Sequence, residues 1–237
     1  FIVNAKVDQV LIGDFDPVRD VNMTLENDGS GALSLAANGV LGSESVDLFY
    51  SAADDEQRFE ISSQNAGNVL KSFESFDSII GGTLSASGFR EERDGRNGWD
   101  VALSVLDFNL VDAPVLARLL SAASIVGLPS VLQGQGITFS RLDSSMHISE
   151  EFLILERLLA EGAALGISAS GSIDRVEDEI DLTGMLVPAF VLNKVIDLIP
   201  LIGTFLTGGE GEGFLASEFG ISGPLEKPLV TVNPLTA

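Results

Sequence analysis

The sequence predicts a mainly β protein, in which a long meandering sheet is interrupted by about three helices. Apolar and polar residues alternate with a period of two in many short segments, as they do in a strand with one apolar face. Three other segments have apolar residues at helical spacing, and each is followed by glycines and then by another strand pattern. The 237 residues are enough for one elongated β domain or for two small domains.

The alternation is clearest in the last third of the chain. From Ala163 to Ile173 the odd positions are mostly apolar, and the even positions are mostly small or polar. After a polar turn at 174–178, the apolar positions of a second segment share one face: Ile180, Leu182 and Leu186. Two alternating segments joined by a short polar turn predict a β-hairpin.

Strands are predicted along most of the remaining chain. Residues 21–25 and 33–37 alternate on either side of a turn rich in Asn, Asp and Gly. In 99–110 the apolar positions change phase after Val105, which indicates a bulge or burial on both faces. The apolar run 152–160 has no clear period, and we assign it to a strand. Further strands are expected near residues 1–12, 45–51, 58–62, 82–89, 136–142, 214–222 and 229–233.

Three segments favour helices. Ser63 is a candidate cap for a helix that runs to about Phe76. Asp112 and Ala113, followed by Pro114, form a good start for a second helix, because proline is favoured in the first helical turn. The third helix is expected from Pro188 to about Ile199, with its apolar residues at helical spacing: Leu192, Val195, Ile196 and Ile199.

The stretch Leu186–Phe214 raises the question of a membrane span, because most of its first part is apolar. Lys194 and Asp197 lie inside this run, and Pro200 interrupts it. A charge at the bilayer centre costs about 2.5–3.5 kcal/mol on insertion scales. We therefore expect an amphipathic helix that covers or closes a sheet, followed by a glycine turn.

Composition narrows the class of protein. The formal net charge is −22, yet the mean hydropathy is +0.31 and 45% of the residues are hydrophobic, so the chain is expected to fold. The acidity argues against nucleic acid as a partner and against docking on anionic headgroups by charge. The absence of cysteine excludes disulfides and cysteine-based metal sites.

The residues indicate no catalytic, metal or cofactor site. His147 lies among serines and carboxylates, but no G-x-S-x-G motif accompanies it. The glycine run 208–213 lacks the G-K-[ST] of a phosphate loop. The acidic clusters 54–56 and 177–179 lack EF-hand spacing and are expected to be solvated turns. We therefore expect a protein that is not an enzyme and needs no cofactor.

Several ordered motifs lie in the last third of the chain. They are G-x-I-D (171–174), L-V-P-A-x-x-L-N (186–193), I-P-L-I-G (199–203), a Gly/Glu run (208–213), F-x-I-S-G-P-L-x-x-P (219–228) and V-N-P-L (232–235). In this order they resemble the C-terminal region of the AsmA-like family, in the branch that includes YhdP, with TamB as a more distant relative. The resemblance is strong over 163–237 and extends to 62–88 and 112–142, whereas residues 1–55 match only in their β character. The signature positions are Pro188, Asn193, Pro200, Gly203, Gly213, Gly223, Pro224, Pro228, Asn233 and Pro234.

The resemblance implies a fold, a location and a function. It implies that residues 1–237 are one elongated domain, a fragment of a longer chain anchored in the inner membrane of a Gram-negative bacterium. The domain would lie in the periplasm as a curved, taco-like antiparallel sheet with an apolar β-groove. Such proteins are thought to carry phospholipid between the inner and outer membranes and to support outer-membrane integrity. The implied partner is phospholipid or another acyl-chain lipid, with membrane contacts through segments absent from this sequence. Protein partners are not indicated.

The hairpin of residues 163–186 supplies the candidate lipid-lining positions. These are Leu165, Ile167, Ile173, Ile180, Leu182 and Leu186, which share the apolar face of two strands. The alternative is that the same residues face an ordinary closed core. In that case the protein would be a periplasmic scaffold or assembly factor in envelope biogenesis.

Overall fold

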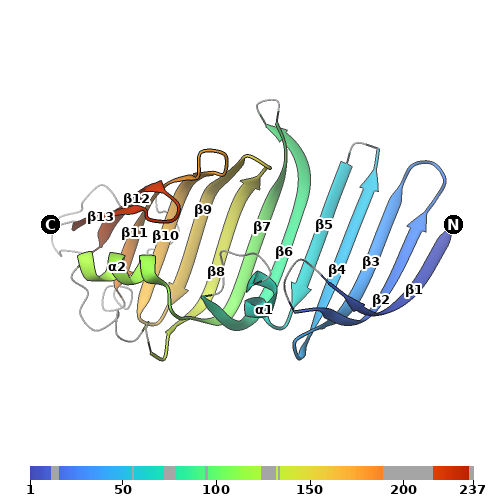
Figure 1. The fold of residues 1–237 in the computed structure, drawn as a ribbon, viewed down its shortest axis with the longest axis horizontal. Coiled ribbons are helices and arrows are strands. Elements are labelled where there is room, and N and C mark those ends of the chain that lie inside the picture. The colour runs from blue at the N-terminus through green and yellow to red at the C-terminus, as the bar shows by residue number, and fades with distance from the viewer. Residues whose placement is uncertain are drawn as a thin grey trace, which may run out of the picture.

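The computed structural model describes residues 1–11, 16–54, 56–71, 78–93, 96–123, 132, 134–188 and 216–234. Within these residues the chain forms one antiparallel sheet of thirteen strands, in which each strand pairs with its neighbours in sequence (Figure 1). The strands are β1 (Ile2–Val10), β2 (Val18–Asn27), β3 (Leu33–Leu41), β4 (Glu44–Ala53), β5 (Glu56–Ser63), β6 (Ile79–Arg93), β7 (Arg96–Leu110), β8 (Ile137–Ile148), β9 (Phe152–Gly162), β10 (Leu165–Asp174), β11 (Glu179–Pro188), β12 (Ser217–Pro224) and β13 (Leu229–Pro234). The expected mainly β, antiparallel fold is confirmed.

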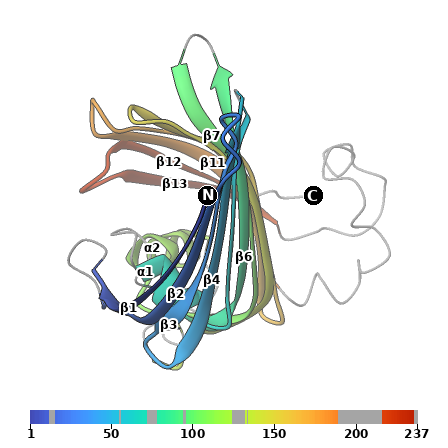
Figure 2. The ribbon, with the colours of Figure 1, turned by 90° about the vertical axis from the view of Figure 1, so that its right-hand side faces the viewer.

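The sheet is curved and unclosed. Figure 2, which looks along the long axis, shows a concave side that holds both helices of the described residues. The two edge strands, β1 and β13, lie at opposite ends of the sheet and do not pair with each other. In a meander of this kind, each strand hydrogen-bonds only to the strands next to it in sequence.

The predicted hairpin of the last third is confirmed as β10 and β11. Ile173 pairs with Ile180, and Ile167 pairs with Leu186, so the apolar positions of both strands share a face as expected. The ambiguous run 152–160 lies in β9, which confirms its assignment to a strand.

The phase change in β7 is not a bulge, because the pairing of β7 with β6 and with β8 keeps one register on both sides of Asp107. Val105 and Phe108 are both buried although they lie three residues apart, and Leu106 between them is 41% exposed. Asp107 makes the shift possible with φ 52°, and Gly82 on the neighbouring strand β6 has φ 80°. In β8 the register with β9 shifts between Phe139 and Arg141. The irregularity thus involves three adjacent strands and bends the sheet, with the register shift itself between β8 and β9.

Two helices are confirmed, with one correction. Helix α1 (Ala66–Lys71) is capped by Asn65, whose Oδ1 accepts a hydrogen bond from the backbone N–H of Asn68 at 3.1 Å, and not by Ser63. Ser63 ends β5, and its hydroxyl instead accepts the N–H of Asn65 at 3.1 Å. Helix α2 (Pro114–Ala122) begins at the proline, as expected.

The third expected helix lies almost entirely outside the described residues, as do Leu192, Val195, Ile196 and Ile199. Pro188, expected near its start, is instead the buried last residue of β11, where it pairs with Leu165. A proline fits there because strand ends tolerate the loss of a backbone donor. No helix in the part of the chain that the structure describes is long and apolar enough to cross a membrane.

The helices cover one margin of the concave side. Helix α1 packs on β6 and β7, between the ends of β5 and β6. Helix α2 leaves the end of β7 and packs against β13, where Arg118 donates a hydrogen bond to the carbonyl of Pro228 at 2.7 Å. The core beneath them contains the most deeply buried large side chains: Leu84, Val105, Phe108, Leu120, Leu132, Ile137, Phe139, Leu165 and Leu186.

Candidate functional site

The concave side carries continuous rows of apolar side chains. Residues paired in an antiparallel ladder point to the same face, so following the pairs from strand to strand traces each row. The middle row contains Ala5, Met23, Ala37, Leu48, Ile61, Ala86, Leu103, Ser144, Leu158, Ala169, Gly184, Phe219 and Val232.

Two further rows flank it. The upper row, nearer the β2–β3 and β10–β11 turns, contains Val3, Leu25, Leu35, Tyr50, Phe59, Gly88, Val101, Met146, Leu155, Gly171, Leu182, Ile221 and Val230. The lower row, nearer the helices, contains Val7, Val21, Gly39, Val46, Ser63, Leu84, Val105, Leu142, Ala160, Ile167, Leu186 and Ser217. We call these three rows the inner face.

The inner face has no Asp, Glu, Lys, Arg or His at any of these positions. Strands about 4.8 Å apart give it a length on the order of 55–60 Å across the thirteen-stranded sheet. The charges lie on the opposite, outer face, for example at Asp47, Glu60, Asp181 and Glu218. In a chain with net charge −22, this segregation leaves an uncharged strip along the whole sheet.

Burial differs between the rows. The lower row is the most buried: Leu84, Val105 and Leu186 are at most 2% exposed, although Val46, Leu142 and Ile167 are partly buried. In the middle and upper rows, side chains such as Leu48, Leu103 and Leu182 are only partly buried. A strip of apolar surface therefore remains open to a ligand beside the closed core. Contiguous apolar surface of this kind is uncommon on soluble proteins and marks interaction sites.

The structure brings the six candidate lining residues to the same side of the sheet, with Leu165 just beyond the lower row, where it pairs with Pro188. Ile167, Ile173, Ile180 and Leu182 are partly buried, with Ile173 and Ile180 paired above the upper row. Leu165 and Leu186 are fully buried, so in this structure they offer no surface to a ligand. Contact of the other four with lipid stays a prediction.

Sequence reasoning missed most of the face, because the alternation of β10 and β11 is stronger than that of other strands. Phe59 is an example: its ring lies against Gly88 and meets Trp99 edge-on, with ring centroids 5.2 Å apart. Phe219 likewise lies against Gly184. An aromatic residue that faces a glycine on the next strand indicates an inner-face position. This pairing can be recognised only once the register of the strands is known.

Ser144 is a polar exception in the middle row. Its side chain is 5% exposed, and its Oγ is the buried side-chain atom without a hydrogen-bond partner among the described residues. An unsatisfied buried hydroxyl costs about 1–3 kcal/mol, so Ser144 is a weak point of the packing under the strip.

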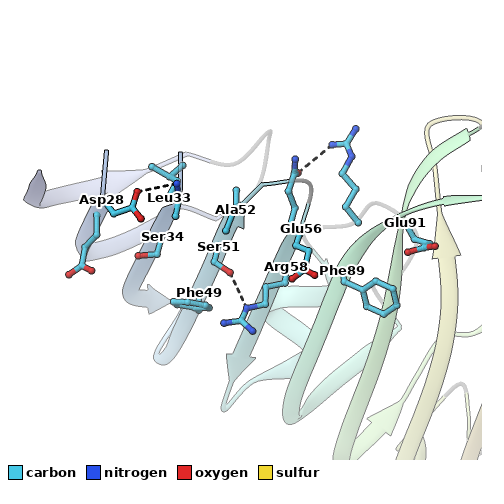
Figure 3. Close-up of a pocket in the computed structure, with 15 residues that line it drawn as sticks. Asp28, Leu33, Ser34, Phe49, Ser51, Ala52, Glu56, Arg58, Phe89 and Glu91 are labelled. Carbon is cyan, nitrogen blue, oxygen red and sulfur yellow. Dashed lines mark hydrogen bonds between the residues drawn. The ribbon is translucent and has the colours of Figure 1, made fainter. Parts of the chain in front are cut away.

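The outer face has a hollow of about 790 Å³ at the upper ends of β2 to β6 (Figure 3). The rings of Phe49 and Phe89 line it, and the Arg58 guanidinium lies 5.8 Å from the centre of the Phe49 ring and donates to the Ser51 hydroxyl at 2.9 Å. Its remaining charged lining is mainly acidic: Glu26, Asp28, Glu56, Glu91 and Arg90. The pKa of Asp28 is lowered chiefly by hydrogen bonds from the Ser30 hydroxyl and backbone, which hold the β2–β3 turn. This mixed, open surface has no arrangement typical of a catalytic centre.

A polar cluster on the outer face joins four strands. His147 is 3% exposed, and its Nδ1 donates to Asp100 Oδ1 at 2.6 Å. Arg93 pairs with the other oxygen of Asp100 and with Glu156 at 2.5 Å. His147 lies in β8, and its Nε2 lies against Gly98. Together, these contacts of Asp100 and Arg93 fix the long β6–β7 hairpin to β8 and β9.

Replacing Asp100 with asparagine is expected to destabilise the fold by roughly 1–2 kcal/mol at neutral pH, because His147 and Arg93 lose an ionised acceptor. Burial by itself raises the pKa of Asp100, but hydrogen bonds from His147 and Arg93 outweigh it and lower that pKa below its ordinary value of 3.8. A carboxyl whose pKa is lowered in the folded state stabilises the fold fully at pH values above its ordinary pKa. This contribution is lost as the pH falls through the folded-state pKa. Urea unfolding should therefore show a difference from the wild type that shrinks below pH 3.8. Asp47→Asn, on the same face, is the control, and equal stability of Asp100→Asn and wild type at neutral pH would contradict this role.

The described signature positions gather at the C-terminal end of the sheet. Gly223, with φ 95°, and Pro224 end β12, while Asn233 and Pro234 end β13. Pro228 is buried, and its carbonyl receives the hydrogen bond from α2. The other signature positions lie outside the described residues: Asn193, Pro200, Gly203 and Gly213.

Comparison of the chain with protein-family models, with curated proteins and with solved structures gives no match. The resemblance to the AsmA-like family therefore stays a prediction based on the motifs alone. The function has to be argued from the inner face itself.

Proposed function

We propose that the inner face binds the acyl chains of lipids, and that the protein is a non-enzymatic lipid-transport segment. The observation that carries the proposal is the uncharged apolar strip, which crosses all thirteen strands and leaves side chains such as Leu48, Leu103 and Leu182 only partly buried. By the family resemblance, the transport would connect the inner and outer membranes, with the protein in the periplasm and anchored to the inner membrane.

The energetic reason is the cost of moving acyl chains through water. Exposing a methylene group costs about 0.8 kcal/mol, or roughly 20 kcal/mol for some 30 methylenes after allowance for incomplete exposure. A continuous apolar strip removes most of this barrier. A row without charges also offers a lipid acyl chain no preferred binding position along the strip. Transfer along such a row needs no nucleotide.

One observation favours the scaffold alternative. Partly buried inner-face residues such as Ile61, Leu103 and Leu182 also pack against the buried core cluster. If they served packing alone, the sheet would be a structural element that acts through protein partners. The two functions differ in whether the purified chain holds lipid.

Two measurements test the proposal: whether the purified chain holds lipid, and on which face of the sheet that lipid lies. The chain should be purified without detergent, extracted with organic solvent, and examined for phospholipid by mass spectrometry. A photoreactive amino acid at Leu48 or Leu182 is expected to crosslink to lipid, whereas the same probe at the adjacent outer positions Asp47 or Thr183 is not. Absence of lipid in the extract, together with absence of crosslinks at both inner positions, would contradict lipid binding and favour the scaffold.

A further inference from the structure

The two long margins of the inner face differ in chemistry. The margin above the upper row is formed by the six turns that join β2–β3, β4–β5, β6–β7, β8–β9, β10–β11 and β12–β13. Each turn has an exposed carboxylate within it or within two residues of it: Asp28, Asp54, Glu92, Glu150, Glu177, Asp178 and Glu226. We call this the acidic margin.

The opposite margin is covered in part by the two helices of the described residues. Helices α1 and α2 occupy the β5–β6 and β7–β8 connections, and their buried residues, such as Leu70 and Leu120, close the lower row. Two of its shorter connections are Gly42–Ser43 and Ala163–Ala164, without charge. A lipid headgroup cannot be buried among these apolar side chains without a large desolvation cost. A lipid on the inner face would therefore hold its headgroup above the upper row, on the side of the acidic margin.

The distances place such a headgroup within reach of the carboxylates. Leu182 of the upper row is four residues from Asp178, or about 13 Å along an extended strand. A headgroup that projects above this row approaches the turns to within about 10 Å, which is close to the Debye length at 0.1 M salt. Basic residues also lie near this margin: Arg93 pairs with Asp100 and Glu156, Arg175 donates to the carbonyl of Ser149 at 3.0 Å, and Arg90 and Lys227 are exposed. The carboxylates of the margin outnumber these basic residues.

We propose that the acidic margin selects lipids by headgroup charge, favouring a zwitterionic, amine-bearing phospholipid over an anionic one. This inference rests on the proposed lipid binding of the inner face. The carboxylates repel a phosphodiester without a compensating charge, and they attract the ammonium of an ethanolamine headgroup. Acting through screened solvent, several such charges are expected to enrich the zwitterionic lipid about threefold.

The experiment offers the purified full chain two lipids with identical acyl chains. Vesicles contain equal amounts of phosphatidylethanolamine and phosphatidylglycerol in a phosphatidylcholine host, and protein-bound lipid is quantified by mass spectrometry after re-isolation. The margin variant combines four neutralising substitutions: Glu150→Gln, Glu177→Gln, Asp178→Asn and Glu226→Gln. Asparagine suits position 178 because Asp178 has φ 59°, a conformation that asparagine tolerates. The matched control makes the same change of charge on the outer face: Asp47→Asn, Glu60→Gln, Asp181→Asn and Glu218→Gln.

The wild type and the outer-face control are expected to hold about threefold more phosphatidylethanolamine than phosphatidylglycerol, and the margin variant is expected to hold the two lipids equally. High salt should abolish the enrichment in the wild type. If the wild type binds the two lipids in the same ratio as the vesicles contain them, the margin does not select lipids. The proposed lipid binding of the inner face would still stand. If the margin variant and the outer-face control lose the selection equally, the selection depends on the net charge of the protein. That result would also overturn the role of the margin. Absence of any bound lipid would overturn the proposed function itself.

Discussion

Replacing Leu182 with aspartate is expected to lower the amount of lipid held by the protein at least tenfold. Leu182 lies in the upper row of the inner face, paired with Gly171 on one side and Ile221 on the other. A carboxylate at this position would have to be desolvated against an acyl chain, at a cost of about 2 kcal/mol or more, and 1.4 kcal/mol already corresponds to tenfold in binding. The measurement is phospholipid per protein in the solvent extract.

The neighbouring position supplies the control. Thr183→Asp adds the same charge one residue away, on the exposed outer face, and is expected to leave lipid content unchanged. Thermal unfolding of both variants shows whether Leu182→Asp remains folded. A folded Leu182→Asp variant with wild-type lipid content would contradict the role of this row.

Replacing Phe108 with alanine is expected to destabilise the fold by about 3–5 kcal/mol, the usual cost of truncating a buried phenylalanine. The side chain is 2% exposed, and its ring stacks on that of Phe139 with centroids 5.3 Å apart. It also packs on Gly82, where an added Cβ would come within 2.8 Å of the Phe108 Cβ. The substitution would leave a cavity beside the irregularity at Asp107, where β7 lies between β6 and β8. Urea unfolding gives the change in stability from the shift of the midpoint.

An exposed phenylalanine provides the comparison. Phe89, on the outer face, is 53% exposed, and Phe89→Ala is expected to change the free energy of unfolding by less than about 1 kcal/mol. Similar losses for the two variants would mean that the Phe108–Phe139 stack does not anchor the bend of the sheet.

Local sequence predicted the strands and their turns well. The alternation from Ala163 to Ile173, the polar turn after it and the shared face of Ile180 and Leu182 are all present in the β10–β11 hairpin. The phase change after Val105 marked the irregularity at Asp107 in β7, and Pro114 marked the start of α2. These features are readable because period, turn residues and proline geometry act over a few residues.

Contacts over long sequence distances could not be predicted in this way. Helix α2 lies between β7 and β8 in sequence but packs against β13, with Arg118 bonded to a carbonyl 110 residues away. His147 gave no sign that it would be buried beside Asp100, because their pairing depends on the register of β7 with β8. Asn65 rather than Ser63 caps α1 because Ser63 is held in the ladder of β5 with β6.

The sequence by itself determined that this protein is a mainly β meander with one apolar and one polar side per strand, since side chains alternate along any extended chain. Tertiary structure decided that the apolar sides of thirteen strands form uncharged rows, with helices along one margin and carboxylates along the other. The physical reason is register. A shift of one residue between two strands would turn the apolar side of one of them outward and break each row, and register is fixed only when the ladders form.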